Sequence, residues 1–133
     1  MTKKKKTKRD ELAEVSILLE TFLNTIDHLG HEYNWCEDKM VELDKLSQDY
    51  LHKLELEDLG YDGRAKIATQ IMNCRRERRE CKDTIMVLKP LYDYATSDKG
   101  KSALNQLRAV LGQVRTAEKR MRDQIYIPRV LKE

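Results

Sequence analysis

Apolar residues recur along residues 12–54 at alternating spacings of three and four, through six consecutive heptads. A 3.5-residue repeat of this length is typical of a helix that packs along a partner helix and supercoils with it. Its two columns hold Leu12, Leu19, Ile26, Tyr33, Met40, Ser47 and Leu54, and Val15, Phe22, Leu29, Cys36, Leu43 and Tyr50. Only Ser47 interrupts the seam, so the pattern predicts one long helix over residues 10–58.

The rest of the chain predicts two shorter helices, over residues 64–88 and 102–124. Gly60 suits a left-handed cap on the first helix and Asp62 the N-cap of the next. Because this connection is short, we expect the two helices to be antiparallel neighbours. Pro90 is expected to end the second helix near residue 88, since the residue before a proline is disfavoured in helical backbone. We expect another helical turn or two starting at Pro90, followed by a loop at 96–100.

Two features leave the path of the chain open. Gly30 is a candidate for a kink in the first helix, although the heptad phase survives across it and favours continuity. The third helix either returns beside the second or continues toward the amino-terminal end of the first. In the first arrangement the Leu12–Leu29 seam stays uncovered and requires a second chain, so we expect a homodimer; in the second the chain can be monomeric.

The shorter helices carry seams of their own, so the fold class we predict is all-α. The second helix has Ile67, Ile71, Cys74, Arg78, Cys81 and Ile85 on one face. The third has Ala103, Leu107, Val110, Val114, Ala117 and Met121 on one face, with Leu104 and Leu111 alongside.

Composition supports this fold and excludes several classes of protein. Charged residues make up 37% of the 133 residues and aromatic residues 6%, which favours long helices over sheets. No apolar run is long enough to span a membrane, and acids directly after the basic start, at Asp10 and Glu11, interrupt any signal peptide. Three cysteines without an export signal indicate reduced thiols and a cytoplasmic location.

Charge divides sharply along the chain. Residues 1–9 carry six positive charges and no acids, residues 10–63 carry three Lys against fifteen acids, and residues 64–133 carry seventeen Lys and Arg against eight acids. We therefore expect a disordered basic arm over 1–9 and one helical domain over 10–124, in which an acidic helix packs on basic ones. The apolar tail over 125–133 is expected to be extended, docked either on its own bundle or on a partner.

Candidate metal ligands and catalytic residues do not form a recognisable site. Cys36, Cys74 and Cys81 fall on facing seams, but structural zinc ligands usually come in close pairs, which are absent here. Glu-x-x-His spacing is approximated only once, at Asp49–His52, and His28 and His31 near Glu32 match a spacing that is common by chance. The sequence has no nucleophile elbow and no phosphate-binding loop. We expect no enzyme activity, metal, cofactor or small-molecule substrate.

Charged helix faces are the remaining candidates for function. The first is an acidic partner-binding face on the long helix: Trp35, Glu37, Asp38, Glu42, Asp44 and Asp49. The second is a set of cations spaced to follow phosphates: Lys3, Lys4, Lys5 and Lys6 in the arm, with Arg75, Arg78, Arg79 and Lys82. Arg115, Lys119, Arg120 and Arg122 form a further basic group. The alternative is that the arginines simply pair with the acids of the first helix, which fits the charge count better.

The second half of the chain resembles small all-helical proteins of bacteriophages and prophages. The resemblance lies in Ala65–Asp83 (AKIATQIMNCRRERRECKD), Leu104–Gly112 and the ending Tyr126–Val130. It implies a protein of the bacterial host's cytoplasm that binds and inhibits a host enzyme or defence complex. We therefore favour a non-catalytic protein-interaction module with a protein partner. A nucleic-acid-binding protein is the alternative.

Overall fold

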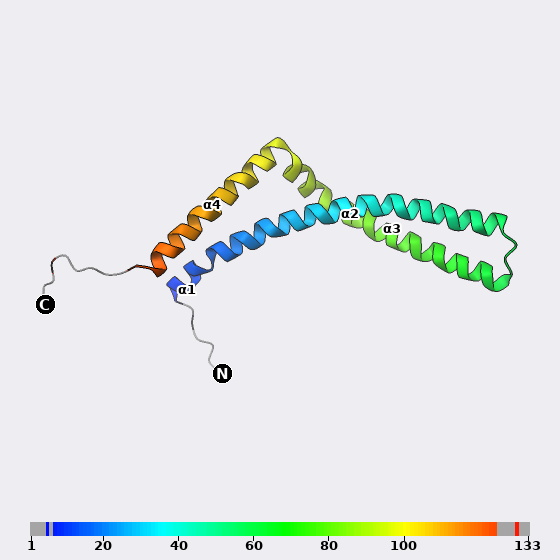
Figure 1. Ribbon diagram of the computed structural model, residues 1–133, viewed down its shortest axis with the longest axis horizontal. Coiled ribbons are helices and arrows are strands. Elements are labelled where there is room, and N and C mark those ends of the chain that lie inside the picture. The colour runs from blue at the N-terminus through cyan, green and yellow to red at the C-terminus, as the bar shows by residue number, and fades with distance from the viewer. Residues whose placement is uncertain (1–4, 6, 125–129, 131–133) are drawn as a thin grey trace. The chain divides into compact units, whose positions relative to one another are not determined.

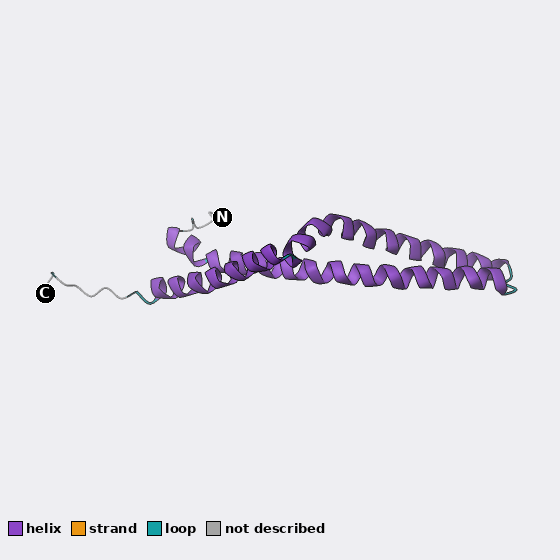
Figure 2. Ribbon diagram, turned by 90° about the horizontal axis from the view of Figure 1, so that it is seen from above, coloured by secondary structure: helices purple, strands orange, loops and turns teal. Residues whose placement is uncertain are grey.

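The computed structural model describes residues 5, 7–124 and 130, and its elements are all helices. They are α1 (Lys8–Ala13), α2 (Val15–Leu56), α3 (Tyr61–Thr96) and α4 (Asp98–Arg122) (Figure 1). No strand occurs among these residues (Figure 2). The all-α prediction is confirmed. Most of the predicted arm and the tail over 125–133 lie outside the described residues, and the arm is shorter than predicted because α1 begins at Lys8.

Contacts divide the described chain into two compact units. Unit 1 combines the residues up to Thr25 with those from Asp98 onward, and unit 2 is Ile26–Ser97. Helix α2 contributes its first part to unit 1 and the rest to unit 2. The expectation of one helical domain over residues 10–124 stays a prediction, because α2 runs through both units without interruption.

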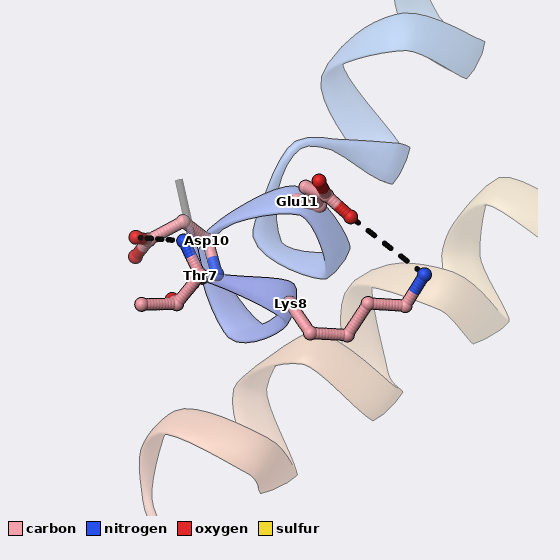
Figure 3. Close-up of polar contacts among 4 residues, drawn as sticks. All are labelled: Thr7, Lys8, Asp10 and Glu11. Atoms are coloured by element: carbon pink, nitrogen blue, oxygen red, sulfur yellow. Dashed lines mark hydrogen bonds and ion pairs between the residues drawn. The ribbon is translucent and has the colours of Figure 1, made fainter. Parts of the chain in front are cut away.

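Helix α1 is a six-residue helix with a complete capping box (Figure 3). The Thr7 hydroxyl accepts a hydrogen bond from the Asp10 N–H, and the Asp10 carboxylate accepts one from the Thr7 N–H, both at 3.2 Å. Lys8 and Glu11 form an ion pair at 3.6 Å on the same turn. The helix ends at Ala13, with Glu14 as its C-cap. The predicted continuous helix over 10–58 is therefore wrong in one respect, because the helix is interrupted at Glu14.

Helix α2 passes through Gly30 without a break, which confirms the continuity indicated by the heptad phase. It ends at Leu56 and α3 begins at Tyr61, so the two helices are antiparallel neighbours, as predicted (Figure 1). The cap assignment was wrong: Gly60 has extended backbone at the N-cap of α3, and Asp62 lies in the first turn. Gly60 has φ −66° and does not need the freedom of a glycine.

Helix α3 continues through Pro90 to Thr96, so the predicted end at residue 88 was wrong. Proline costs about 3 kcal/mol inside a helix, because it lacks an N–H and crowds the preceding turn. Packing beyond the proline opposes this cost: the Tyr92 ring stacks on Tyr33 with centroids 3.9 Å apart, and its hydroxyl donates to Asn34 at 2.9 Å. The last part of α3, in yellow-green, bends away from the line of the rest (Figure 1).

The predicted loop at 96–100 is also wrong. Ser97 alone separates α3 from α4, and its N–H donates to the carbonyls of Asp93 and Tyr94 at 3.1 Å. Its backbone is extended, with ψ 158°, which ends α3. Helix α4 therefore begins at Asp98, four residues earlier than predicted, and ends at Arg122.

The core of unit 2 is the predicted seam. Its columns from Ile26 to Leu54 are buried or half-buried, and Leu43 is only 2% exposed. The facing seam of α3 is also as predicted, with Arg78 half-buried within it. The buried residues here are Tyr33, Cys36, Leu43, Ile67, Cys74 and Cys81. Tyrosine, leucine and thiol side chains thus alternate along one continuous helix pair.

Unit 1 buries a different face of α2 from the predicted one. Leu23 is 4% exposed, whereas the predicted seam residue Phe22 is 53% exposed, and Ser16 is buried in place of Val15. The reason lies in α4, which bonds to this side of α2: Glu118 Oε1 accepts the Ser16 N–H at 2.9 Å, and Arg115 pairs with Glu20 at 2.9 Å. One residue along a helix is about 100° around its axis, so the stripe at 15 and 22 is left outside.

These contacts also decide the path of the third predicted helix. Met121 bonds to Arg9, Glu118 to Ser16 and Arg115 to Glu20, so α4 runs antiparallel to the start of the chain. This is the second of the two predicted arrangements. The α4 seam is shifted as well: Leu104 and Leu111 are buried, whereas Val110 and Ala117 are exposed.

Candidate functional site: a basic groove between α2 and α3

Unit 2 carries an open groove of about 990 Å³ between α2 and α3. Residues of α3 supply its charge, and only one carboxylate, Asp44 of α2, lies among them. The cations that line it are Arg75, Arg76, Arg78, Arg79 and Lys82. Three of the four residues predicted for the arginine face lie on one flank of α3, and Arg78 belongs to the seam. Arg76 was not predicted, because it lies toward the outer side of the helix.

Only one of these cations is neutralised within the described chain. Arg78 Nε donates to Asp44 Oδ1 at 2.6 Å, a short charge-assisted hydrogen bond. Within residues 7–124, no ion pair or hydrogen bond engages the side chains of Arg75, Arg76, Arg79 or Lys82. The expectation that the arginines of α3 pair with the acids of α2 therefore holds for Arg78 and fails for the others. The groove keeps an unbalanced positive charge.

Apolar side chains line the groove between the two helices. Leu51 of α2 is 49% exposed and Met72 of α3 is 43% exposed, and Ala68 and Ile71 lie beside them. Burying exposed apolar surface of this kind against a partner contributes a favourable free energy of about 25 cal/mol per Å². The signal was present in the sequence, since Ala68 and Met72 are off-seam apolar residues one helical turn apart.

The predicted acidic face does not form a single surface. Asp44 lines the groove, whereas Glu42 contacts Lys39 at 3.5 Å, on another side of α2. Lys39 also pairs with Glu77 of α3 at 3.8 Å and lies 6.0 Å from the Trp35 ring centroid. The remaining members, Glu37, Asp38 and Asp49, are exposed. Trp35 is thus an exposed aromatic residue beside a small charged network, separate from the groove.

The other predicted cations are not brought to the groove by any described contact. Lys5 is exposed, and Lys3, Lys4 and Lys6 lie outside the described residues. On α4, Arg115 is engaged by Glu20, whereas Lys119, Arg120 and Arg122 are exposed. The α4 group belongs to unit 1 and is a second basic surface rather than part of the site.

The three thiols are core residues. Cys36, Cys74 and Cys81 are buried in the α2–α3 seam. Burial, with a hydrogen bond that the Cys81 thiol donates to Cys36, raises the pKa of Cys81 to about 11, and burial also raises the pKa of Cys74. A thiol with a raised pKa is a poor nucleophile and a poor metal ligand, because both roles need the thiolate. Among the described residues, no group of His, Cys, Asp and Glu could hold a metal ion.

Unit 1 carries an exposed apolar stripe. Leu18 is 68% exposed and Phe22 53% exposed, and Val15 lies on the same face of α2. Val110 of α4 is also exposed. We expected a second chain on this part of the long helix in the arrangement that leaves the Leu12–Leu29 seam uncovered, but α4 packs here instead. The homodimer stays a prediction, and it now depends on the exposed stripe alone.

No family model, curated protein or solved structure matches this chain. In the part of the chain that the structure describes, no helix combines the length and apolar character needed to cross a bilayer. The site therefore has to be interpreted from its own geometry and charge.

Proposed function

We propose that the protein is a non-catalytic interaction module that binds an acidic segment of a partner protein in the α2–α3 groove. One observation carries the proposal. Four cations without partners in the described chain line the same groove as apolar side chains that are about half exposed. These exposed cations attract a partner of opposite charge, and exposed apolar area favours contact with another apolar surface. An acidic protein segment with apolar residues satisfies both.

Nucleic acid is the second candidate, and the spacing of Arg75, Arg79 and Lys82 supports it. Cations three or four residues apart on one helix face can follow phosphates, and the lysine-rich start of the chain would add affinity. The lining of the groove favours protein instead. Leu51 and Met72 offer nothing to phosphates, and no aromatic side chain lines the groove to stack on a base.

The resemblance to phage proteins extends the proposal to the identity of the partner. On that basis the partner is a bacterial host enzyme or defence complex, which the protein inhibits by occupying an acidic surface. This step depends on the resemblance alone.

The test is zero-length cross-linking in a bacterial lysate with a carbodiimide, which joins an amine directly to a carboxylate. We expect a product that links Lys82 to an Asp or Glu of one partner protein, located by mass spectrometry. Lys66 is the internal control, because it is an exposed lysine of α3 outside the groove lining.

The matched variants separate the groove from net charge. Arg75→Glu, Arg79→Glu and Lys82→Glu together should abolish capture of the partner. Lys45→Glu, Lys66→Glu and Lys101→Glu make the same change in net charge outside the groove and should leave capture intact. Equal loss in both triple variants would contradict the proposal. Retention of random single-stranded or duplex DNA by the wild type, steeply weakened by salt and lost only in the groove variant, would favour nucleic acid.

A further inference from the structure

The surface of the groove repeats the spacing of the seam below it. On α3, Ala68, Met72, Arg75, Arg79 and Lys82 follow one another at intervals of four, three, four and three residues. On α2, Asp44, Gln48 and Leu51 follow at four and three. Each helix therefore presents a second heptad-spaced stripe, directly beside the one that it buries against its neighbour. Two such stripes side by side form the surface on which a third helix packs in a helical bundle.

We infer that the occupant of the groove is an amphipathic α-helix of the partner, which completes a three-helix bundle with α2 and α3. The inference rests on the proposed function and adds the conformation and pattern of the bound segment. From Ala68 to Lys82 the α3 stripe is roughly 20 Å long at 1.5 Å per residue, which matches about four helical turns. The occupant places an apolar stripe against Leu51 and Met72, and acids against Arg75, Arg79 and Lys82.

The backbone favours a helical occupant over an extended one. Residues 44–51 and 68–82 lie inside helices, so their N–H and carbonyl groups already bond within α2 and α3. An extended peptide would find no strand edge in the groove to pair with its own backbone. A helix satisfies its own backbone and offers only side chains. The two apolar positions and the cations set the register by side chains alone.

The stripe continues beyond the groove with the same chemistry. Met86, four residues after Lys82, is exposed, and so is Val41, three residues before Asp44. Both positions extend the heptad spacing on their helices. A longer helix therefore gains apolar contacts at the Met86 end.

The experiment uses the full chain and three designed 21-residue peptides, each fluorescently labelled and held at nanomolar concentration to avoid self-association. The first has leucine at the a and d positions and glutamate at e and g. The second has the same composition with the leucines scattered, and the third has lysine in place of glutamate. We expect the first peptide to bind about tenfold more tightly than the second, the difference expected when one or two apolar side chains become buried. It should also gain helix content on binding, measured by circular dichroism.

The protein variants locate the binding. Arg75→Glu, Arg79→Glu and Lys82→Glu together should abolish binding of the first peptide, and Met72→Glu should weaken it to the level of the scattered peptide. The control triple variant at Lys45, Lys66 and Lys101 should bind as the wild type does. A variant protein that has less helix content than the wild type in the absence of peptide is replaced by a milder substitution, Met72→Ser or Arg79→Gln. Each of these should also weaken binding of the first peptide.

The other outcomes overturn the inference at different levels. Equal affinity for the first and second peptides would show that the groove recognises negative charge regardless of the leucine pattern. This result would overturn the inference of a helical occupant and leave the proposed function standing. Failure of both acidic peptides to bind would overturn the proposed function as well. Preference for single-stranded DNA over both peptides, lost in the groove variant, would replace the protein partner with nucleic acid.

Discussion

The two units join helix to helix by different means. Unit 2 packs a continuous seam of apolar, thiol and tyrosine side chains, and its polar contacts lie at the edges. Unit 1 buries fewer large apolar residues, namely Leu23, Leu104 and Leu111. Two polar residues, Ser16 and Glu118, are buried as well. In unit 2 a continuous heptad seam sets the register of the helix pair, and polar contacts between Arg78 and Asp44 and between Tyr92 and Asn34 add to it. In unit 1, where the seam is thinner, a directional bond contributes more to the register.

The bond in unit 1 also compensates for the break before α2. The first N–H groups of a helix have no partner within it, and α2 starts abruptly after Glu14. Glu118 accepts the Ser16 N–H and so caps α2 from another helix. A carboxylate near the positive end of a helix is also favourable electrostatically.

The largest loss of stability should come from creating a cavity in the seam of unit 2. Leu43→Ala removes a side chain that is 2% exposed and should lower the free energy of unfolding by about 3 kcal/mol. Leu23→Ala in unit 1 should cost less, because the exposed neighbours there can move inward. Urea denaturation followed by circular dichroism measures both, with Val41→Ala on the surface as the control. An equal or larger loss for Leu23→Ala would contradict the comparison.

The exposed stripe of unit 1 should mediate self-association. Leu18→Ser with Phe22→Ser should raise the dissociation constant of a dimer at least about a hundredfold, because apolar side chains from both copies lose their buried contacts. Light scattering over a range of concentrations measures the change, and Trp35→Ser, at another exposed position of α2, is the control. A wild-type protein that remains monomeric at the highest concentration would rule out the dimer.

Acid should weaken unit 1 through Glu118. Hydrogen bonds from the Ser16 hydroxyl and N–H hold the pKa of this carboxyl below its ordinary value. The bond therefore stabilises the folded state above the unfolded pKa, about 4.3, and this contribution is lost as the pH falls through the folded value. Glu118→Gln should lower the thermal midpoint at neutral pH by less than Leu43→Ala does.

The pH profile separates the charge of Glu118 from its size. The difference in midpoint between wild type and Glu118→Gln should shrink as the pH falls through the lowered folded-state pKa of Glu118, because the wild-type carboxyl becomes protonated there. Glu80→Gln, at an exposed carboxylate of unit 2, should leave the profile unchanged. A constant difference between Glu118→Gln and wild type at every pH would show that the carboxylate charge is not involved.

The smallest effects should be gains at two glycines. A Cβ at Gly30 or at Gly112 would meet no atom within 4 Å, and both residues lie inside helices. Gly30→Ala in unit 2 and Gly112→Ala in unit 1 should therefore each raise stability by about 0.5–1 kcal/mol, since alanine lowers the entropy of the unfolded chain. Loss of stability at either position, measured by urea denaturation, would show that the glycine serves a close approach or a motion.

The sequence predicted the helices of unit 2 well, because periodicity reports directly on a seam that a single neighbour covers. Tyr33, Cys36 and Leu43 are buried at the predicted heptad positions. It failed where a distant contact overrode a local rule. Pro90 should have ended α3, but packing of Tyr92 on Tyr33 carries the helix through it. In the same way, the bond between Glu118 and Ser16 rotated the buried face from Phe22 to Leu23.

The candidate site could be predicted only in part. Helical spacing placed Arg75, Arg79 and Lys82 on one flank of α3, which the groove confirms. The pairing with acids could not be predicted, because it depends on the register of α2 against α3. Counts of charge suggested many pairs, and within residues 7–124 the groove holds one, between Arg78 and Asp44.

The distance in sequence between Ser16 and Glu118 bears on how the chain folds during synthesis. These residues are 102 positions apart, whereas Asp44 and Arg78 are 34 apart. Contacts between nearby residues close smaller loops and form sooner. We therefore expect the α2–α3 pair to fold while the ribosome is still translating α4. The Ser16 N–H in the first turn of α2 can then bond to Glu118 only after α4 has emerged from the ribosome.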